Sequence, residues 1–188
     1  MSDQFKTVLM NAKAGCGVDP SEARIVYRHV HGDATRLNPY AILAFGQIFS
    51  PEPTEIDHLR SLLRPAIAND NQEVLSAILK VLVRYWESGS EAVDELEACL
   101  NLDPLFFNEE IDLALLGLAS AAFVTKDKAL VEKISQYLIR LAHSGFEGDV
   151  QRIIPEIERE LLGAPPSFSD RDAELVTTSR INDLGKLL

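Results

Sequence analysis

Carboxylates are the side chains most able to do chemistry in this chain, and they are concentrated in one stretch. From Glu87 to Thr125 the sequence has nine Asp and Glu residues and no Lys or Arg, so this acidic window carries −9 of the chain's net charge of −11. The nine are Glu87, Glu91, Asp94, Glu95, Glu97, Asp103, Glu109, Glu110 and Asp112. Because repulsion between like charges destabilises a compact fold, we interpret the window as a surface for a positively charged partner. An ordinary solvated acidic face is the alternative.

Two groups of acids within the window have different explanations. In a helix expected over 90–101, spacings of three and four residues place Glu91, Asp94 and Glu95 on one exposed face. The last three acids of the window fall in the first turn of the next expected helix, where the helix dipole stabilises a carboxylate by roughly 0.3–1 kcal/mol. The dipole therefore gives the second group a structural role without a partner, and the first group stays unexplained.

Aromatic residues lie at the edges of these acids. Trp86 precedes the window, and Phe106 and Phe107 follow Asp103 within it. Aromatic side chains beside carboxylates are typical of a hot spot for a basic protein. The alternative is that they close the ends of helix pairs, which we favour for Phe106 and Phe107 jointly. The predicted partner-binding residues are Trp86, Glu87, Glu91, Asp94, Glu95, Asp103, Phe106, Phe107, Glu109 and Glu110.

Signatures of catalysis and metal binding do not occur in the sequence. His29 and His31 are two residues apart in an expected helix, so their side chains point to different sides and do not chelate one ion together. Cys16, between two glycines, would need a partnered histidine to act as a nucleophile. The sequence has no HExxH, calcium-loop, P-loop, GxSxG or GxGxxG pattern. We therefore expect no catalytic residue, no metal and no cofactor, although a pair of carboxylates of the glycosidase type stays open.

Helices must position these residues, because apolar residues recur at helical spacing and no segment alternates with the period of a strand. Helix starts are marked by a capping residue before proline, at Asp19-Pro20 and Asn38-Pro39, and by Asp70 with Glu73. The fold class is therefore all-α, with short loops that make successive helices antiparallel neighbours. The expected helices cover 3–14, 20–31, 39–49, 54–68, 71–86, 90–101, 108–124, 127–143 and 150–162, with a short one within 170–187.

A weak internal repeat relates some of these helices. Those at 39–49, 71–86 and 109–124 align with offsets of 34 and then 37 residues, and each precedes a second amphipathic helix. A period of this length made of helix pairs is typical of an α-solenoid. The segment 112–124 is apolar nearly all round, so we expect it to be covered on most sides. Its small residues, such as Gly117, would let neighbouring backbones approach closely.

The run from Glu73 to Pro104 resembles a tetratricopeptide unit. The matching positions are Leu79, Ala92, Leu96, Cys99 and Pro104. Lys80 stands where that repeat has glycine, and Glu87-Ser88-Gly89 is a loose version of its turn. The varying period is also similar to that of HEAT-like helix pairs. Either resemblance implies a helical-repeat scaffold that binds other proteins and has no catalytic role.

The expected domain organisation is a helical-repeat domain over 1–162, followed by a linker and C-terminal helix over 163–188. The linker opens with Gly-Ala-Pro-Pro, and Ile181, Leu184 and Leu187 are spaced for one apolar helix face. We expect this helix to dock on the repeats as a cap, because the ends of a solenoid need covering. Docking on a second copy of the chain, as a homodimer, is the alternative.

Charge and cysteine usage limit the classes of function. Residues 1–90 hold ten acids and nine bases, whereas residues 91–188 hold nineteen acids and nine bases. An acidic surface repels phosphate, which disfavours nucleic acids and anionic membranes as partners. The two cysteines form no CxxC pair, the start lacks the apolar run of a signal peptide, and the longest apolar stretch, of twelve residues, is too short to span a bilayer. We therefore expect a cytoplasmic protein.

The hypothesis that follows is a non-enzymatic protein-binding module whose acidic surface engages a basic protein. One form of it is an immunity or inhibitor protein that covers the basic surface of a toxin, and another is an adaptor or assembly factor in a larger complex. An enzyme or small-ligand binder with a cavity between the helices is the alternative from a different class. A pocket with convergent polar groups would favour that alternative.

Overall fold

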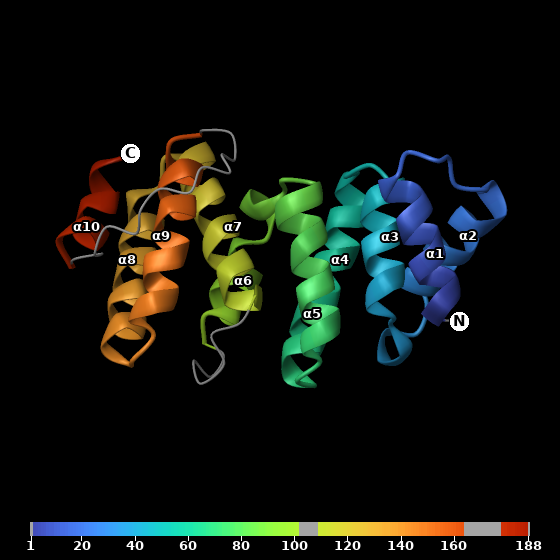
Figure 1. Cartoon of the computed structure of the whole chain (residues 1–188), viewed down its shortest axis with the longest axis horizontal. Coiled ribbons are helices and arrows are strands. Elements are labelled where there is room, and N and C mark those ends of the chain that lie inside the picture. The colour runs from blue at the N-terminus through green and yellow to red at the C-terminus, as the bar shows by residue number, and fades with distance from the viewer. Residues whose placement is uncertain (1, 102–108, 164–177, 188) are drawn as a thin grey trace. The chain divides into compact units, whose positions relative to one another are not determined.

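The computed structural model describes residues 2–101, 109–163 and 178–187, and the regular structure in these ranges is helical throughout (Figure 1). The all-α prediction is therefore confirmed, while the solenoid arrangement stays a prediction. The chain divides into two compact units, Met1–Ser88 and Gly89–Leu188, which we call unit 1 and unit 2. Their boundary falls inside the helical-repeat domain expected over 1–162.

Unit 1 is organised around its most apolar helix, α3. This helix contacts α1, α2, α5 and η2, and it buries Ala41, Ile42, Ala44 and Phe45 completely. The core of unit 1 therefore forms on several sides of α3, while Gln47 stays exposed. The helices are α1 (Ser2–Lys13), α2 (Pro20–Val30), the 3₁₀ turn η1 (Ala34–Arg36), α3 (Pro39–Ile48), α4 (Pro53–Ala68), α5 (Gln72–Leu79) and the π-helix η2 (Lys80–Tyr85).

Unit 2 is organised in the same way around α7, which contacts η3, α6, α8 and α9. The predicted covering of this apolar helix is confirmed. A Cβ added at Gly89 would lie 2.8 Å from the carbonyl oxygen of Gly117, so the expected close approach of backbones at Gly117 is also confirmed. The helices are η3 (Gly89–Glu91), α6 (Val93–Cys99), α7 (Glu109–Thr125), α8 (Lys128–His143), α9 (Glu147–Leu161), α10 (Thr178–Asp183) and η5 (Leu184–Lys186).

Side-chain caps fix several helix starts. The carboxylate of Asp19 accepts the Ser21 N–H at 2.7 Å, and Asn38 accepts the Tyr40 N–H at 2.9 Å, so both predicted caps before proline are confirmed. The predicted cap at Asp70 is wrong by one residue. Asn71 caps α5 by accepting the Val74 N–H at 3.3 Å, while Asp70 turns the chain with a left-handed φ of 50°.

The helix expected over 90–101 is interrupted, and this changes where its acids lie. The Ala92 N–H bonds to the Gly89 carbonyl at 3.1 Å and closes the 3₁₀ turn η3, after which α6 begins at Val93. Glu91 therefore belongs to η3 and does not share a helix face with Asp94. The helix expected over 71–86 changes in a similar way, because α5 ends at Leu79 and continues as the π-helix η2.

The C-terminal helix packs inside unit 2. Both α10 and η5 contact α8, with Ile181 and Leu184 buried, and the Ser135 hydroxyl donates a hydrogen bond to the Ile181 carbonyl at 3.3 Å. In the part of the chain that the structure describes, none of the helices combines the length and apolar character needed to cross a bilayer.

Candidate functional site

Most of the net negative charge of the chain lies in one of its two units. Unit 2 holds nineteen acids and nine bases, a net charge of −10, whereas unit 1 holds ten acids and nine bases, a net charge of −1. Glu87 ends up in unit 1, exposed and with a left-handed φ of 52°, and the other acids of the window belong to unit 2. The change in charge along the sequence thus coincides with a structural boundary.

Burial divides the acids that were predicted to bind a partner. Glu91, Asp94 and Glu109 are exposed, but the exposed fractions of Glu95 and Glu110 are only 8% and 6%. The prediction that Glu95 and Glu110 lie on a binding surface needs correction. Glu95 lies one helical turn before the buried Cys99 and so shares its inward face of α6. Burial, with the charges of Glu110 and Glu95, raises the pKa of the Cys99 thiol to about 12.

An exposed group of charges joins α6 to the start of α8. Lys133 Nζ lies 2.5 Å from Glu97 Oε1, and the pKa of Lys133 is raised by this hydrogen bond and by the charges of Glu97, Asp127 and Asp94. We call these three acids and Lys133 the Lys133 patch. The four residues of the patch carry a net charge of −2, and the exposed Lys126 and Lys128 flank Asp127 in sequence.

Asp112, one of the three acids in the first turn of α7, forms an ion pair within unit 2. Asp112 Oδ2 lies 2.7 Å from the Arg152 guanidinium on α9, whereas Asp112 Oδ1 is buried and has no hydrogen-bond partner in the described ranges. Burial raises the pKa of Asp112, and the bond to Arg152 opposes that rise. Asp112 therefore ties α7 to α9 and is not a free surface charge.

Trp86 is a core residue of unit 1, and its prediction as a surface hot spot is wrong. Its side chain is 7% exposed, and its indole N–H is shared between the carbonyls of Gly46 and Phe49, each at 3.1 Å. A buried indole needs such acceptors, and the end of α3 supplies them. Of the remaining predicted residues, Asp103, Phe106 and Phe107 lie outside the described residues.

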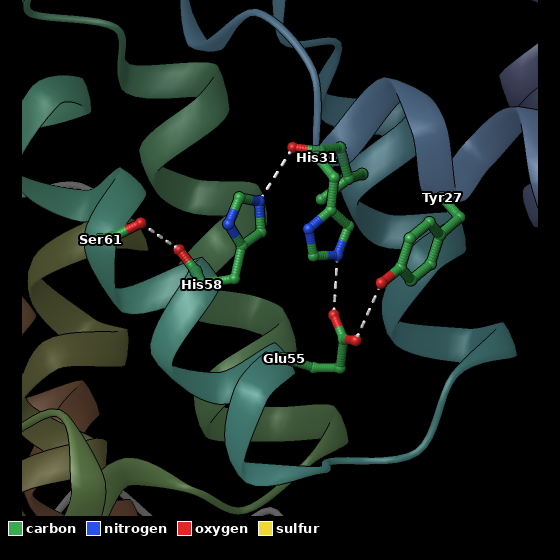
Figure 2. A network of polar contacts seen from close by, with 6 residues as sticks. Tyr27, His31, Glu55, His58 and Ser61 are labelled. Carbon is green, nitrogen blue, oxygen red and sulfur yellow. Dashed lines mark hydrogen bonds and ion pairs between the residues drawn. The ribbon is translucent and has the colours of Figure 1, made fainter.

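A polar network that the sequence did not reveal joins α2 to α4 in unit 1 (Figure 2). Glu55 Oε2 lies 2.8 Å from His31 Nε2, and Tyr27 OH approaches Glu55 Oε1 at 3.4 Å. His58 Nε2 donates to the Val30 carbonyl at 3.0 Å. The His31 ring is stacked between Tyr27 and His58, with centroid distances of 4.2 and 3.9 Å. The i, i+4 spacing of Tyr27 and His31 was the available signal, but their partners come from another helix.

The network is better suited to joining helices than to catalysis. A histidine bonded to a carboxylate can act as a general base, but a reaction also needs a nucleophile or a bound substrate within reach. The nearby Ser61 hydroxyl donates to the His58 carbonyl at 2.6 Å and so is engaged within its own helix. The negative charge of Glu55 raises the pKa of Tyr27, which keeps the phenol protonated. The contacts therefore describe a clamp between α2 and α4.

Unit 1 also contains a cavity of about 380 Å³ beside η1 and the end of α4. Apolar and polar side chains line it together, and no histidine of the network is among them. The lining residues are Ala34, Thr35, Leu37, Leu62, Pro65, Ala66, Asn69, Asp70, Asn71 and Val74.

Neither metal-site geometry nor similarity identifies a function. Among the described residues, no three His, Cys, Asp or Glu side chains are grouped closely enough to hold a metal ion. Comparison of the chain with protein-family models, with curated proteins and with solved structures finds no match.

Proposed function

We propose that this chain is a non-enzymatic protein-binding module whose unit 2 engages a basic protein. The observation that carries the proposal is the distribution of charge, with −10 on unit 2 and −1 on unit 1. A folded unit with this excess of one sign attracts oppositely charged partners and accelerates their association. An inhibitor that covers the basic surface of a nuclease is one form that this function would take.

The proposed contact surface is smaller than the acidic window. It consists of the exposed Glu91 and the Lys133 patch, on η3, on α6, and on the N-cap and second turn of α8. Glu95, Glu110 and Asp112 are excluded because their carboxylates are buried or paired within unit 2. Within the Lys133 patch, Lys133 leaves part of the negative charge of the three acids uncompensated. A lysine or arginine of the partner would supply the missing positive charge.

Charge reversal tests this surface. The double variant Glu91→Lys with Asp94→Lys places two positive charges on it without removing a helix cap. The control double variant Glu132→Lys with Glu147→Lys makes the same change in net charge at exposed positions outside the Lys133 patch. Wild-type chain and both variants are used to capture proteins from the source cell, and the captured partner is then purified for stopped-flow binding at several salt concentrations.

The expected partner is a basic protein that the wild type and the control capture and the first double variant loses. We expect the association rate to fall on the order of tenfold for the first double variant, and to fall for the wild type as salt increases. A partner without excess positive charge, or a rate that responds equally to both double variants, would contradict the proposal. The second result would show that net charge alone, rather than this surface, drives association.

A further inference from the structure

The cavity of unit 1 is bounded by three short stretches of chain. η1 contributes Ala34 and Thr35, the second half of α4 contributes Leu62, Pro65 and Ala66, and the turn into α5 contributes 69–71. Its volume of about 380 Å³ lies at the small end of the range of roughly 300–1,000 Å³ that is usual for ligand sites. A molecule with one ring and a short arm is the size that such a site accepts.

Apolar and polar side chains of the lining favour different parts of a ligand. Leu37, Leu62, Pro65 and Val74 supply an apolar wall, which favours a hydrocarbon body in the ligand. The polar lining residues are Thr35, Asn69, Asp70 and Asn71. An apolar lining with a few polar groups orients a ligand that has one apolar end and one polar end.

Asp70 is the only charged residue among those that line the cavity. Its side chain is exposed, and it makes no hydrogen bond or ion pair with any other described residue. It also follows the C-terminal end of α4, where the helix dipole contributes partial negative charge. The polar end of a ligand would therefore meet a negative potential, which favours a cation.

The start of α5 does not reverse this preference. Helix N-termini attract anions, but the Asn71 side chain already accepts the Val74 N–H, and Glu73 places a carboxylate in the first turn. Arg36, in η1 beside the lining residue Thr35, is exposed, and its Nε lies 3.6 Å from Asp33 Oδ2. Neither Arg36 nor Arg64, which is closer to Asp70 in sequence, is among the residues that line the cavity. No basic side chain of the lining competes with a bound cation.

We propose that this cavity binds a small organic cation, an amine or guanidine carried on an apolar body. The body packs between Leu62 and Val74, and the cationic group donates hydrogen bonds to the Asp70 carboxylate and the Asn69 side-chain carbonyl. A charge-assisted hydrogen bond of this kind is roughly twice as strong as a neutral one. The proposal concerns unit 1 and does not depend on the basic protein partner proposed for unit 2.

Three probes of similar size test the charge preference on the full chain. They are 2-phenylethylamine, 2-phenylethanol and 3-phenylpropanoate, which are cationic, neutral and anionic, and each is titrated with amide and methyl chemical shifts as the readout. The amine should bind at least tenfold more tightly than the alcohol, the acid should bind most weakly, and the shifts should map to Leu62 and Val74. Equal affinity for amine and alcohol, preference for the acid, or no saturable binding of any probe would overturn the proposal.

Variants separate the carboxylate from general charge. Asp70→Asn keeps the shape of the side chain, and Asn tolerates a left-handed φ well, so the turn should be retained. It should weaken the amine about tenfold and leave the alcohol unchanged. Asp57→Asn removes an exposed carboxylate elsewhere on α4 and should have no effect. Ala34→Leu, at an exposed lining position, should abolish binding of all probes while thermal unfolding stays unchanged. Amine affinity that is undiminished in Asp70→Asn, or amine binding that persists in Ala34→Leu, refutes the site.

Discussion

Gly46 should be the most sensitive position of unit 1 to the addition of a single methyl group. It lies fully inside α3, facing η2, and a Cβ at this position would be 2.5 and 2.6 Å from the two methyl carbons of Val81 and 3.1 Å from the Tyr85 ring. Val81 is buried and β-branched, so it has little freedom to rotate away. Gly46→Ala therefore forces η2 away from α3.

The expected magnitude follows from two opposing effects. Overpacking of a close-packed core usually costs about 1–3 kcal/mol, and contacts well below 3 Å place this case toward the upper end. Alanine gains about 1 kcal/mol over glycine in helix propensity, which offsets part of the cost. Displacing η2 also disturbs the bond from the Trp86 indole to the Gly46 carbonyl. We expect a net loss of about 2 kcal/mol in the free energy of unfolding.

Urea denaturation followed by tryptophan fluorescence measures this loss, because Trp86 is the single tryptophan of the chain and lies in unit 1. Val81→Ala removes the two clashing methyl groups and leaves a cavity, so on its own it should also destabilise by about 2 kcal/mol. In the double variant the new methyl group occupies part of that cavity. The double variant should therefore be more stable than the sum of the single effects by about 1–2 kcal/mol.

The control for helix propensity is Gly148→Ala in α9, where an added Cβ meets nothing within 4 Å. This variant should be as stable as the wild type or slightly more stable, as measured by circular dichroism. Unfolding of Gly46→Ala at the same urea concentration as the wild type would contradict the clash with Val81. Simple additivity of the effects of Gly46→Ala and Val81→Ala would contradict it as well.

Three further predictions concern the backbone, pH and thiol chemistry. Gly89→Ala should destabilise unit 2 by about 2–3 kcal/mol in thermal unfolding. The added Cβ would lie 2.8–3.2 Å from backbone atoms of Gly117, which cannot rotate away as a side chain can. Unchanged stability would contradict this expectation. Burial lowers the pKa of His29, and its Nε2 accepts a backbone N–H, so folding stability is fully present above about pH 6.5 and falls as the pH decreases below it. His29→Gln should flatten that fall in urea midpoints measured at several pH values, and an equally steep fall would count against the assignment. Cys16 is exposed and Cys99 is buried with a pKa of about 12, so a thiol reagent at neutral pH should label Cys16 alone until urea unfolds the chain.

The positions of most helices could be predicted because their capping residues and their apolar spacing lie within the helix segments themselves. An Asp or Asn before proline marks where α2 and α3 begin, and the apolar run of α7 indicates that other helices surround it. The predictions of a continuous helix over 71–86 and over 90–101 were wrong because of contacts between elements that are distant in sequence. In these segments the regular α-helix is replaced by the π-helix η2, which packs against Gly46, and by the 3₁₀ turn η3, which packs against Gly117. The spacing of apolar residues in the sequence does not indicate such contacts.

The candidate sites were harder to predict, because they depend on which helices meet. Helical spacing in the sequence predicts that Glu91, Asp94 and Glu95 share one exposed face. The helix is interrupted after η3, and Glu95 lies on the inward face of α6, so it is buried. The spacing of His29 and His31 likewise predicts only that these two side chains point to different sides of a helix. The bond of His31 to Glu55 and its stacking on His58 exist only because α4 lies beside the end of α2.

The concentration of charge in unit 2 also makes its folding respond to dissolved ions. Its net charge of −10 falls within Gly89–Leu188, so compaction of this unit brings like charges together while compaction of unit 1, at −1, does not. Salt shortens the range of that repulsion, to about 10 Å at 0.1 M. Unit 2 should therefore gain stability as ionic strength rises, and unit 1 should change little. The counterions around unit 2 are in this sense one of the components that hold it folded.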